Sequence, residues 1–371
     1  MNTRLIGRTF LHPAADYLLI GGGLSLLTVP LVLGMRDAAA DGLFSFRGPQ
    51  LFGIAVMSYF VLVANSAHFA ASTVRLYTKP GAGTALPFLS FAFPLVTLGV
   101  LGLCLALPET AGRHLQSLYL TWSPYHYAAQ AYGLAVMYSF RSGCLIDGRE
   151  KKWLWWAAMM PFFYAFSFTG SGRTGIGWLV PIPLGEVPVA GPLLAGLQLG
   201  LEWVLPVASF ALPIGLYVRV ARSGKGPMPL ISLVVLLANA VWWLVLPDLD
   251  AFMLATIFHS IQYLVIIAIF HVRDQQAEPT NRHSGRWHAW TFYGACLVLG
   301  YALFHLMPRG FVWAGAGPVE SFMLVAATIN LHHFIVDGYI WRLKKSDPNR
   351  RVVDAGADAA DAAAPTGAVP A

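Results

Sequence analysis

Runs of about twenty predominantly apolar residues recur along the whole chain, and this feature restricts the possible fold more than any other. Such runs are long enough to cross a bilayer as α-helices. Only helices and closed barrels satisfy their backbone polar groups in lipid, and these runs lack the alternation of barrel strands. Only 11% of the 371 residues are charged, against roughly 25% in soluble domains. The sequence therefore predicts an all-α, polytopic integral membrane helical bundle.

About ten transmembrane helices are expected from these apolar runs. Their ranges are 16–36, 51–72, 86–108, 114–140, 152–170, 192–218, 228–247, 251–272, 286–307 and 320–342. With this count, 19 of the 24 basic residues fall on the side of the N-terminus, and only five arginines fall on the other side. Basic residues accumulate on the cytoplasmic side of membrane proteins. We therefore expect a multi-pass protein of the inner (plasma) membrane with both termini in the cytoplasm.

The chain reads as one domain with a polar tail. Residues 1–345 contain no polar stretch long enough to fold separately, which predicts a single transmembrane bundle. Residues 346–371 are rich in Ala, Asp and Pro and are expected to form a disordered cytoplasmic tail. The net charge of +6 is explained by anchoring at the inner face, so no nucleic-acid partner is expected. The expected partners are the lipid bilayer and a lipophilic small molecule, and the sequence identifies no redox partner.

The 11 histidines differ in their expected depth. Five fall inside predicted spans: His68, His126, His259, His332 and His333. The remainder include His114, His271, His283 and His288, which lie at span ends or in loops where a solvated imidazole needs no special role. Ionisable groups inside a membrane are costly and usually face the bundle interior. One such histidine fits a hydrogen-bonded core residue equally well, but five together favour a shared site.

Each intramembrane histidine has polar companions three or four residues away, on the same face of its helix. These companions are Asn65, Gln130, Gln262, Tyr263, Asn330 and Asp337. Metal-bound histidines usually donate their second ring nitrogen to such a partner, so Asn65, Gln130, Gln262 and Asn330 are predicted to orient the imidazoles. The alternative is that the pairs are hydrogen bonds between packed helices.

The predicted metal ligands are His68, His126, His259, His332 and His333, with His333 preferred over His332 and with His12 joining from the inner end of the first span. Adjacent helical residues point about 100° apart, so the two side chains of the His332–His333 pair do not readily face a single ion. A two-metal site using both is the alternative. Asp337 is expected to accept a hydrogen bond from His333 or to bind the metal directly. Tyr263 and Asp337 are the predicted catalytic residues.

Several cofactors agree with these ligands. Imidazole and carboxylate without cysteine suit iron, zinc, copper or manganese. Iron with a vacant position would activate dioxygen, whereas zinc with a bound water would catalyse hydrolysis. Two other classes remain open. Paired histidines on facing helices would ligate haem b in a membrane cytochrome, and a proton-coupled transporter would use the His, Gln and Asp residues as a relay.

Four short segments resemble, in the same order, the histidine motifs of the bacterial Brp/Blh-type carotene-cleaving membrane dioxygenases. They are LHPAAD at His12, SAHF at His68, FHSIQY at His259 and LHHFIVD at His332 and His333. This chain lacks the second histidine of the third motif and adds SPYHYAAQAYG, which contains His126. The resemblance implies an iron-dependent, non-haem oxygenase that acts on a lipophilic substrate. Because of the added motif, it does not specify carotene.

Overall fold

The computed structural model describes residues 3–35, 50–51, 54–79, 86–168, 190–223, 226, 228–246, 248–341 and 352–354. The N-terminal half contains α1 (Thr3–Ile6), α2 (Pro13–Ala15), η1 (Asp16–Ile20), α3 (Gly23–Met35), β1 (Gln50–Leu51), β2 (Ile54–Ala55), α4 (Val56–Phe60), η2 (Val61–Ser66), α5 (Ala67–Thr78), η3 (Phe88–Ala92), α7 (Phe93–Ala106), η4 (Pro108–Gly112), α8 (Arg113–Arg141) and α9 (Gly148–Phe168), where η marks a π-helical turn. The C-terminal half contains α11 (Ala190–Arg222), α12 (Leu230–Leu244), α13 (Asp248–Ala277), α14 (Gly285–Tyr301), η6 (Ala302–Leu306), α15 (Met307–Trp313) and α16 (Pro318–Ile340).

The described part of the chain is predominantly helical, as the apolar runs predict, and helix is present in each of the expected ranges. One boundary differs. The range beginning at 51 starts with a short antiparallel ladder, in which Gln50 pairs with Ala55 and Leu51 with Ile54. Helix α4 begins only at Val56. Strand pairing thus occupies the first residues of a segment that was expected to be helical.

Five of the described helical segments are long and apolar enough to cross a membrane, which supports a membrane protein. They are Phe88–Ala106, Leu199–Arg222, Ala251–Ala277, Gly285–Trp313 and Pro318–Ile340. Two shorter helices, Pro13–Ile20 and Gly23–Gly34, meet at a 53° bend and raise the number to six if they form one broken span. Gly22 lies at this bend with φ of +82°, a conformation that glycine adopts without the steric cost of a Cβ atom.

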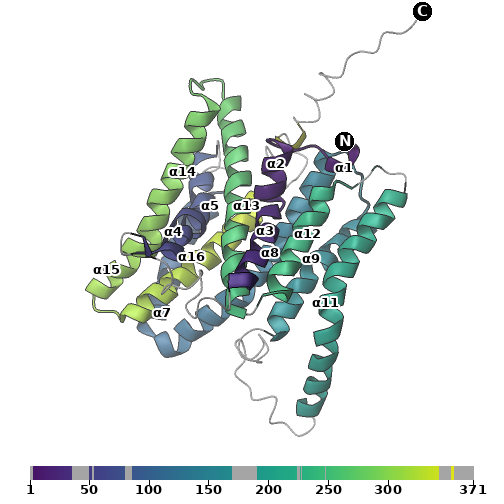
Figure 1. The fold of residues 1–371 in the computed structure, drawn as a ribbon. Coiled ribbons are helices and arrows are strands. Elements are labelled where there is room, and N and C mark those ends of the chain that lie inside the picture. The colour runs from purple at the N-terminus through teal and green to yellow at the C-terminus, as the bar shows by residue number, and fades with distance from the viewer. Residues whose placement is uncertain are drawn as a thin grey trace, which may run out of the picture.

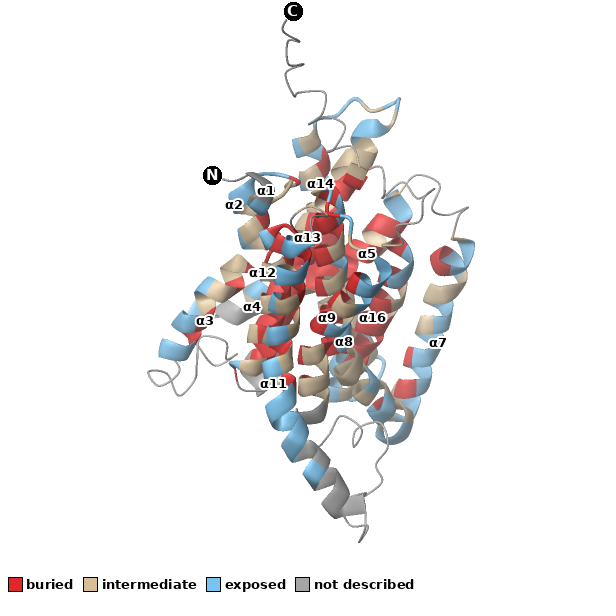
Figure 2. Cartoon of the chain, turned by 90° about the vertical axis from the view of Figure 1, so that its right-hand side faces the viewer, coloured by how far each residue is buried: buried red, intermediate tan, exposed pale blue. Residues whose placement is uncertain are grey.

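Two helices form the centre of the bundle. Burial covers 72% of the apolar window in Ala251–Ala277 and 61% of that in Pro318–Ile340, but only 17–28% in the other three segments. Figure 1 shows α13 in the middle, with α14 and α15 toward one edge and α11 at the other. In Figure 2, buried residues gather around the central helices, whereas much of α7 and α11 is exposed. The outer helices thus present apolar side chains that suit contact with lipid.

The two ends of the described chain meet at one end of the bundle. The Arg141 guanidinium donates hydrogen bonds to the carbonyl oxygens of Thr9, at 2.9 Å, and Val353, at 3.1 Å. Arg273 donates to the carbonyl oxygen of Val352 at 2.9 Å. Val352 and Val353 are buried, which differs from the disorder expected for the tail. Apart from residues 352–354, the tail lies outside the described part of the chain.

Candidate metal centre

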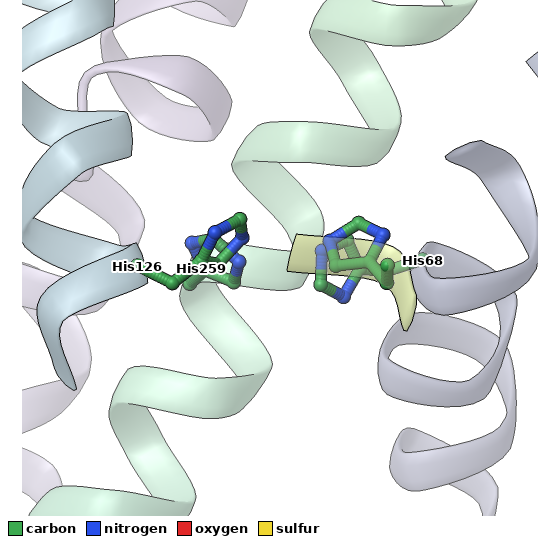
Figure 3. A group of neighbouring side chains, drawn as sticks. His68, His126 and His259 are labelled. Carbon is green, nitrogen blue, oxygen red and sulfur yellow. The ribbon is translucent and has the colours of Figure 1, made fainter. Parts of the chain in front are cut away.

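Four histidines from four separate helices converge inside the bundle. They are His68 of α5, His126 of α8, His259 of α13 and His333 of α16. Each offers a ring nitrogen, and these four nitrogens all lie within 4.8 Å of one another. Figure 3 shows the rings of His68, His126 and His259 gathered between their helices. Segments up to 265 residues apart in the chain therefore supply one compact group of imidazoles.

The imidazole rings form a closed circuit of contacts. His68 lies 4.7 Å from His259 and 4.4 Å from His333, measured between ring centres. His126 completes the circuit, at 4.9 Å from His259 and 5.1 Å from His333. Nitrogen–metal bonds of about 2.0–2.1 Å place opposite ligands on one ion about 4.2 Å apart. Small shifts of these rings are therefore enough to bring all four nitrogens to one ion.

The hydrogen bond at the far side of His68 shows which of its nitrogens is free. The Ser260 hydroxyl donates its single hydrogen to the Thr256 carbonyl oxygen at 2.6 Å. Its oxygen lies 3.2 Å from His68 Nδ1, so Nδ1 is best placed to carry a hydrogen and donate it. The hydrogen on Nδ1 leaves Nε2 unprotonated, as metal binding requires.

His333 has the same arrangement, built from a different helix. The Ser72 hydroxyl donates to the Phe69 carbonyl oxygen at 3.2 Å and lies 2.9 Å from His333 Nδ1. Nδ1 is again the favoured donor, and Nε2 is left with its lone pair. Two of the four imidazoles are thus fixed by serines of facing helices.

The Nε2 atoms of all four histidines are buried and lack a hydrogen-bond partner among the described residues. An unsatisfied buried polar atom typically costs about 1–3 kcal/mol. His259 also has no partner at Nδ1, and its ring packs 4.3 Å from that of Tyr127. His126 stacks on Phe334 at 4.4 Å. Four neighbouring histidines whose Nε2 atoms lack a hydrogen bond are explained simply if these nitrogens are metal ligands.

Asp337 lies at the edge of this cluster. Its Oδ2 atom is 3.6 Å from His333 Nε2 and 3.9 Å from His126 Nε2. The Tyr263 hydroxyl donates a short hydrogen bond to the other carboxylate oxygen, Oδ1. Asp337 therefore lies beside the nitrogens that face the centre, while the Nδ1 atom of His333 is already bonded to Ser72. Asp337 is not among the four residues whose ligand atoms lie within 4.8 Å of one another, so its position fits a partner at the edge of the cluster.

Two predicted ligands are not part of the cluster. His332 points away from it and stacks on Phe93 of α7, with ring centres 4.9 Å apart and an interplanar angle of 14°. The 100° turn between adjacent helical residues accounts for this difference from His333. His12 is exposed and caps α2, where its Nδ1 accepts a hydrogen bond from the Ala14 N–H at 3.2 Å. The structure thus brings together four of the six predicted histidines.

The predicted orienting residues lie nearby but do not bond to the imidazoles. Gln130 donates to the His259 backbone carbonyl at 3.2 Å and to the Gln262 side chain at 3.3 Å. Asn330 donates to the carbonyl of Ala326 on its own helix at 2.7 Å. Asn65 reaches His68 only through Ser260, whose hydroxyl lies 3.4 Å from the Asn65 Oδ1 atom. These contacts fit the alternative of hydrogen bonds that support helix packing.

The two orienting serines were missed because the prediction paired residues within one helix. An imidazole that points into the bundle presents its far nitrogen to a neighbouring helix, so the partner comes from there. Ser72 follows His68 by four residues but contacts His333, and Ser260 follows His259 directly but contacts His68. Their nearness to histidines in the sequence was the available signal. Which histidine each would meet depends on the packing.

Comparison of the chain with protein-family models, curated proteins and solved structures finds no match. The resemblance to the Brp/Blh-type enzymes therefore stays an expectation based on short motifs. Functional conclusions rest on the chemistry of the cluster itself.

Proposed function

We propose that this chain is an integral membrane metalloenzyme in which His68, His126, His259 and His333 hold a non-haem iron ion. The reaction proposed is the oxidation or cleavage of a lipophilic substrate with dioxygen. The observation that carries the proposal is the convergence of four buried histidines, whose Nε2 atoms have no hydrogen-bond partner among the described residues. Iron in such a site would supply the redox chemistry that activates dioxygen.

The residues around the centre have roles that follow from their contacts. Ser72 and Ser260 orient His333 and His68 through their Nδ1 atoms. Tyr263 and Asp337 share a hydrogen bond at the edge of the site and can hold a proton there. The aromatic rings of Phe69, Tyr127 and Phe334 pack against the histidines. This apolar wall excludes water and suits a lipophilic substrate.

The geometry favours a non-haem ion over haem b. In haem, the four porphyrin nitrogens occupy the positions around the iron in one plane, and protein ligands bind only above and below it. Here four histidine nitrogens lie within 4.8 Å of one another, so two of them would occupy the space of the porphyrin. A haem would require two of the helices to move apart.

We further propose that the chain crosses the plasma membrane ten times, with both termini in the cytoplasm. Five of the expected ranges correspond to helices that are apolar enough by themselves. The other ranges contain helices with polar residues or short lengths, such as α8 with His126 and the 15-residue α12. Polar residues that face a buried metal centre lower the hydropathy of a span without exposing charge to lipid.

Purification in detergent, followed by metal analysis and an absorption spectrum, tests the function. About one iron per chain without a Soret band is the expected result. A Soret band would instead establish a haemoprotein, and zinc alone would indicate hydrolytic chemistry. Absence of any metal, also after reconstitution with ferrous iron under anaerobic conditions, would overturn the proposal and favour a carrier.

A further inference from the structure

A cavity of about 580 Å³ lies where the ends of α5 and α13 meet the start of α14. This volume falls within the usual range of small-molecule sites, roughly 300–1,000 Å³. Its polar lining includes Thr78, His271, Gln275, Asn281 and His288. These histidines lie at span ends, and their positions in the sequence did not indicate a site. In the structure they face one pocket.

The cavity is distinct from the metal centre. His271 and His259 both belong to α13 and are twelve residues apart, which corresponds to about 18 Å along a helix. None of the histidines lining the pocket belongs to the metal-binding group found in the described part of the chain. The pocket therefore offers a binding site of its own.

Hydrogen bonds within the protein determine what His271 and His288 can offer a ligand. The Thr78 hydroxyl donates to the Val74 carbonyl oxygen at 2.7 Å, so it accepts from His271 Nδ1, 3.4 Å away. His288 Nε2 lies 2.8 Å from the Asn281 side-chain oxygen, which can only accept. His271 Nε2 and His288 Nδ1 are thus left as acceptors, and neither bonds to another described residue. A ligand that satisfies both nitrogens must therefore carry two hydrogen-bond donors.

The spacing and charge of the lining restrict the ligand further. The two rings are 6.5 Å apart between centres, so two donors on neighbouring carbons of one head group can lie between them. Glu278 and Arg282 both line the pocket and give it no net charge. Trp287 and Phe292 add aromatic faces, each stacked on a histidine. An uncharged, partly planar head group fits this lining.

We propose that this pocket binds a vicinal diol at the head of an amphipathic molecule, with His271 Nε2 and His288 Nδ1 each accepting one hydroxyl hydrogen. Two sources share this chemistry, namely a catechol ring and the glycerol or sugar head of an uncharged lipid. The binding does not depend on the metal centre or on the proposed reaction. It can be tested on the purified chain whether or not metal is present.

Calorimetric titration of the full chain in an amine-oxide detergent, which has no hydroxyl groups, provides the test. The probes are 4-butylcatechol and 1-O-octylglycerol, with 4-butylphenol as the matched compound that has a single hydroxyl. We expect saturable binding of at least one diol, and roughly 2- to 10-fold weaker binding of the phenol, the usual effect of losing one hydrogen bond. The diol that binds more tightly identifies the source.

Variants locate the site. His271→Phe and His288→Phe keep an aromatic ring but remove one acceptor, and each should weaken diol binding by a similar factor. His305→Phe is the control. This residue lies in η6, which follows α14 at the end away from the pocket, so the variant should bind the diol like the unaltered protein. Unfolding temperature and metal content should be unchanged in all three. Equal affinity for diol and phenol, or unaltered binding in both pocket variants, would overturn the proposal.

Discussion

At the residue scale, the proposed centre depends on the direction of a few side chains. His332 and His333 are neighbours in sequence, but His332 contacts Phe93 whereas His333 contacts His68 and His126. We expect His333→Ala to lose metal and activity, whereas His332→Ala should retain both. Metal content per chain measures the difference. Loss of metal in both variants to the same degree would support the two-metal arrangement instead.

The serines that orient the imidazoles give a second prediction. Ser72→Ala and Ser260→Ala remove the acceptors for His333 Nδ1 and His68 Nδ1. Loss of such an outer partner typically lowers metal affinity by 10–100-fold, so that range is expected here. Competition with a chelator measures it. Ser209→Ala is a suitable control, because among the described residues this buried hydroxyl bonds only to the Leu205 carbonyl on its own helix, and it should leave affinity unchanged.

Asp337 differs from the serines because it lies on the side of the Nε2 atoms. Asp337→Asn keeps the shape and removes the charge, and we expect it to lower metal occupancy or turnover by about 10–100-fold. Tyr263→Phe removes the hydrogen bond to Oδ1 and should lower turnover with metal content preserved. Full metal and activity in Asp337→Asn would make the carboxylate a structural partner only.

At the element scale, the position of His68 depends on the close approach of α14 to the chain before α5. A Cβ atom on Gly300 would lie 2.6 Å from the Ser66 carbonyl oxygen and 3.0 Å from the Ala67 nitrogen, both backbone atoms. Neither can move without shifting the helix that carries His68. Small residues allow membrane helices to pack this closely. The glycine thus sets the spacing between two elements beside the metal centre.

Gly300→Ala should therefore destabilise the bundle by about 1–3 kcal/mol, the usual cost of overpacking, and reduce metal occupancy. Gly294→Ala is the matched control on the same helix, since a Cβ atom there would meet nothing within 4 Å. Unfolding temperature in detergent and iron content provide the readouts. Similar stability of the two variants would show that α14 and α5 can separate without cost.

At the scale of the whole molecule, the contacts of Arg141 with Thr9 and Val353 bring both ends of the described chain together. This arrangement agrees with an even number of spans. Reporter fusions after residue 9 and after residue 353 should both report the cytoplasm, and fusions within residues 169–189 should report the outside. Opposite locations for the two ends would contradict the ten-span topology.

The sequence by itself determined the class of fold and most of the candidate site. Apolar runs longer than a soluble core helix leave few alternatives to a helical membrane protein, and helix is present in each expected range. Burying an imidazole in a span is costly, so His68, His126, His259 and His333 stood out before their contacts were known. The preference for His333 over His332 also followed from helix geometry alone, because Asp337 shares its face.

Only the tertiary structure decided which partners these side chains meet. Helical periodicity relates residues three or four apart, but the hydrogen bonds to His68 and His333 come from facing helices, and no local pattern encodes that pairing. Local patterns likewise did not indicate the pocket lined by His271 and His288, because Thr78, His271 and Asn281 come from three separate segments. His12 shows the opposite error, since a motif suggested a ligand where the local backbone uses the ring as a cap. Contacts between helices depend on packing along the whole chain, whereas the cost of burying a polar group belongs to the residue itself.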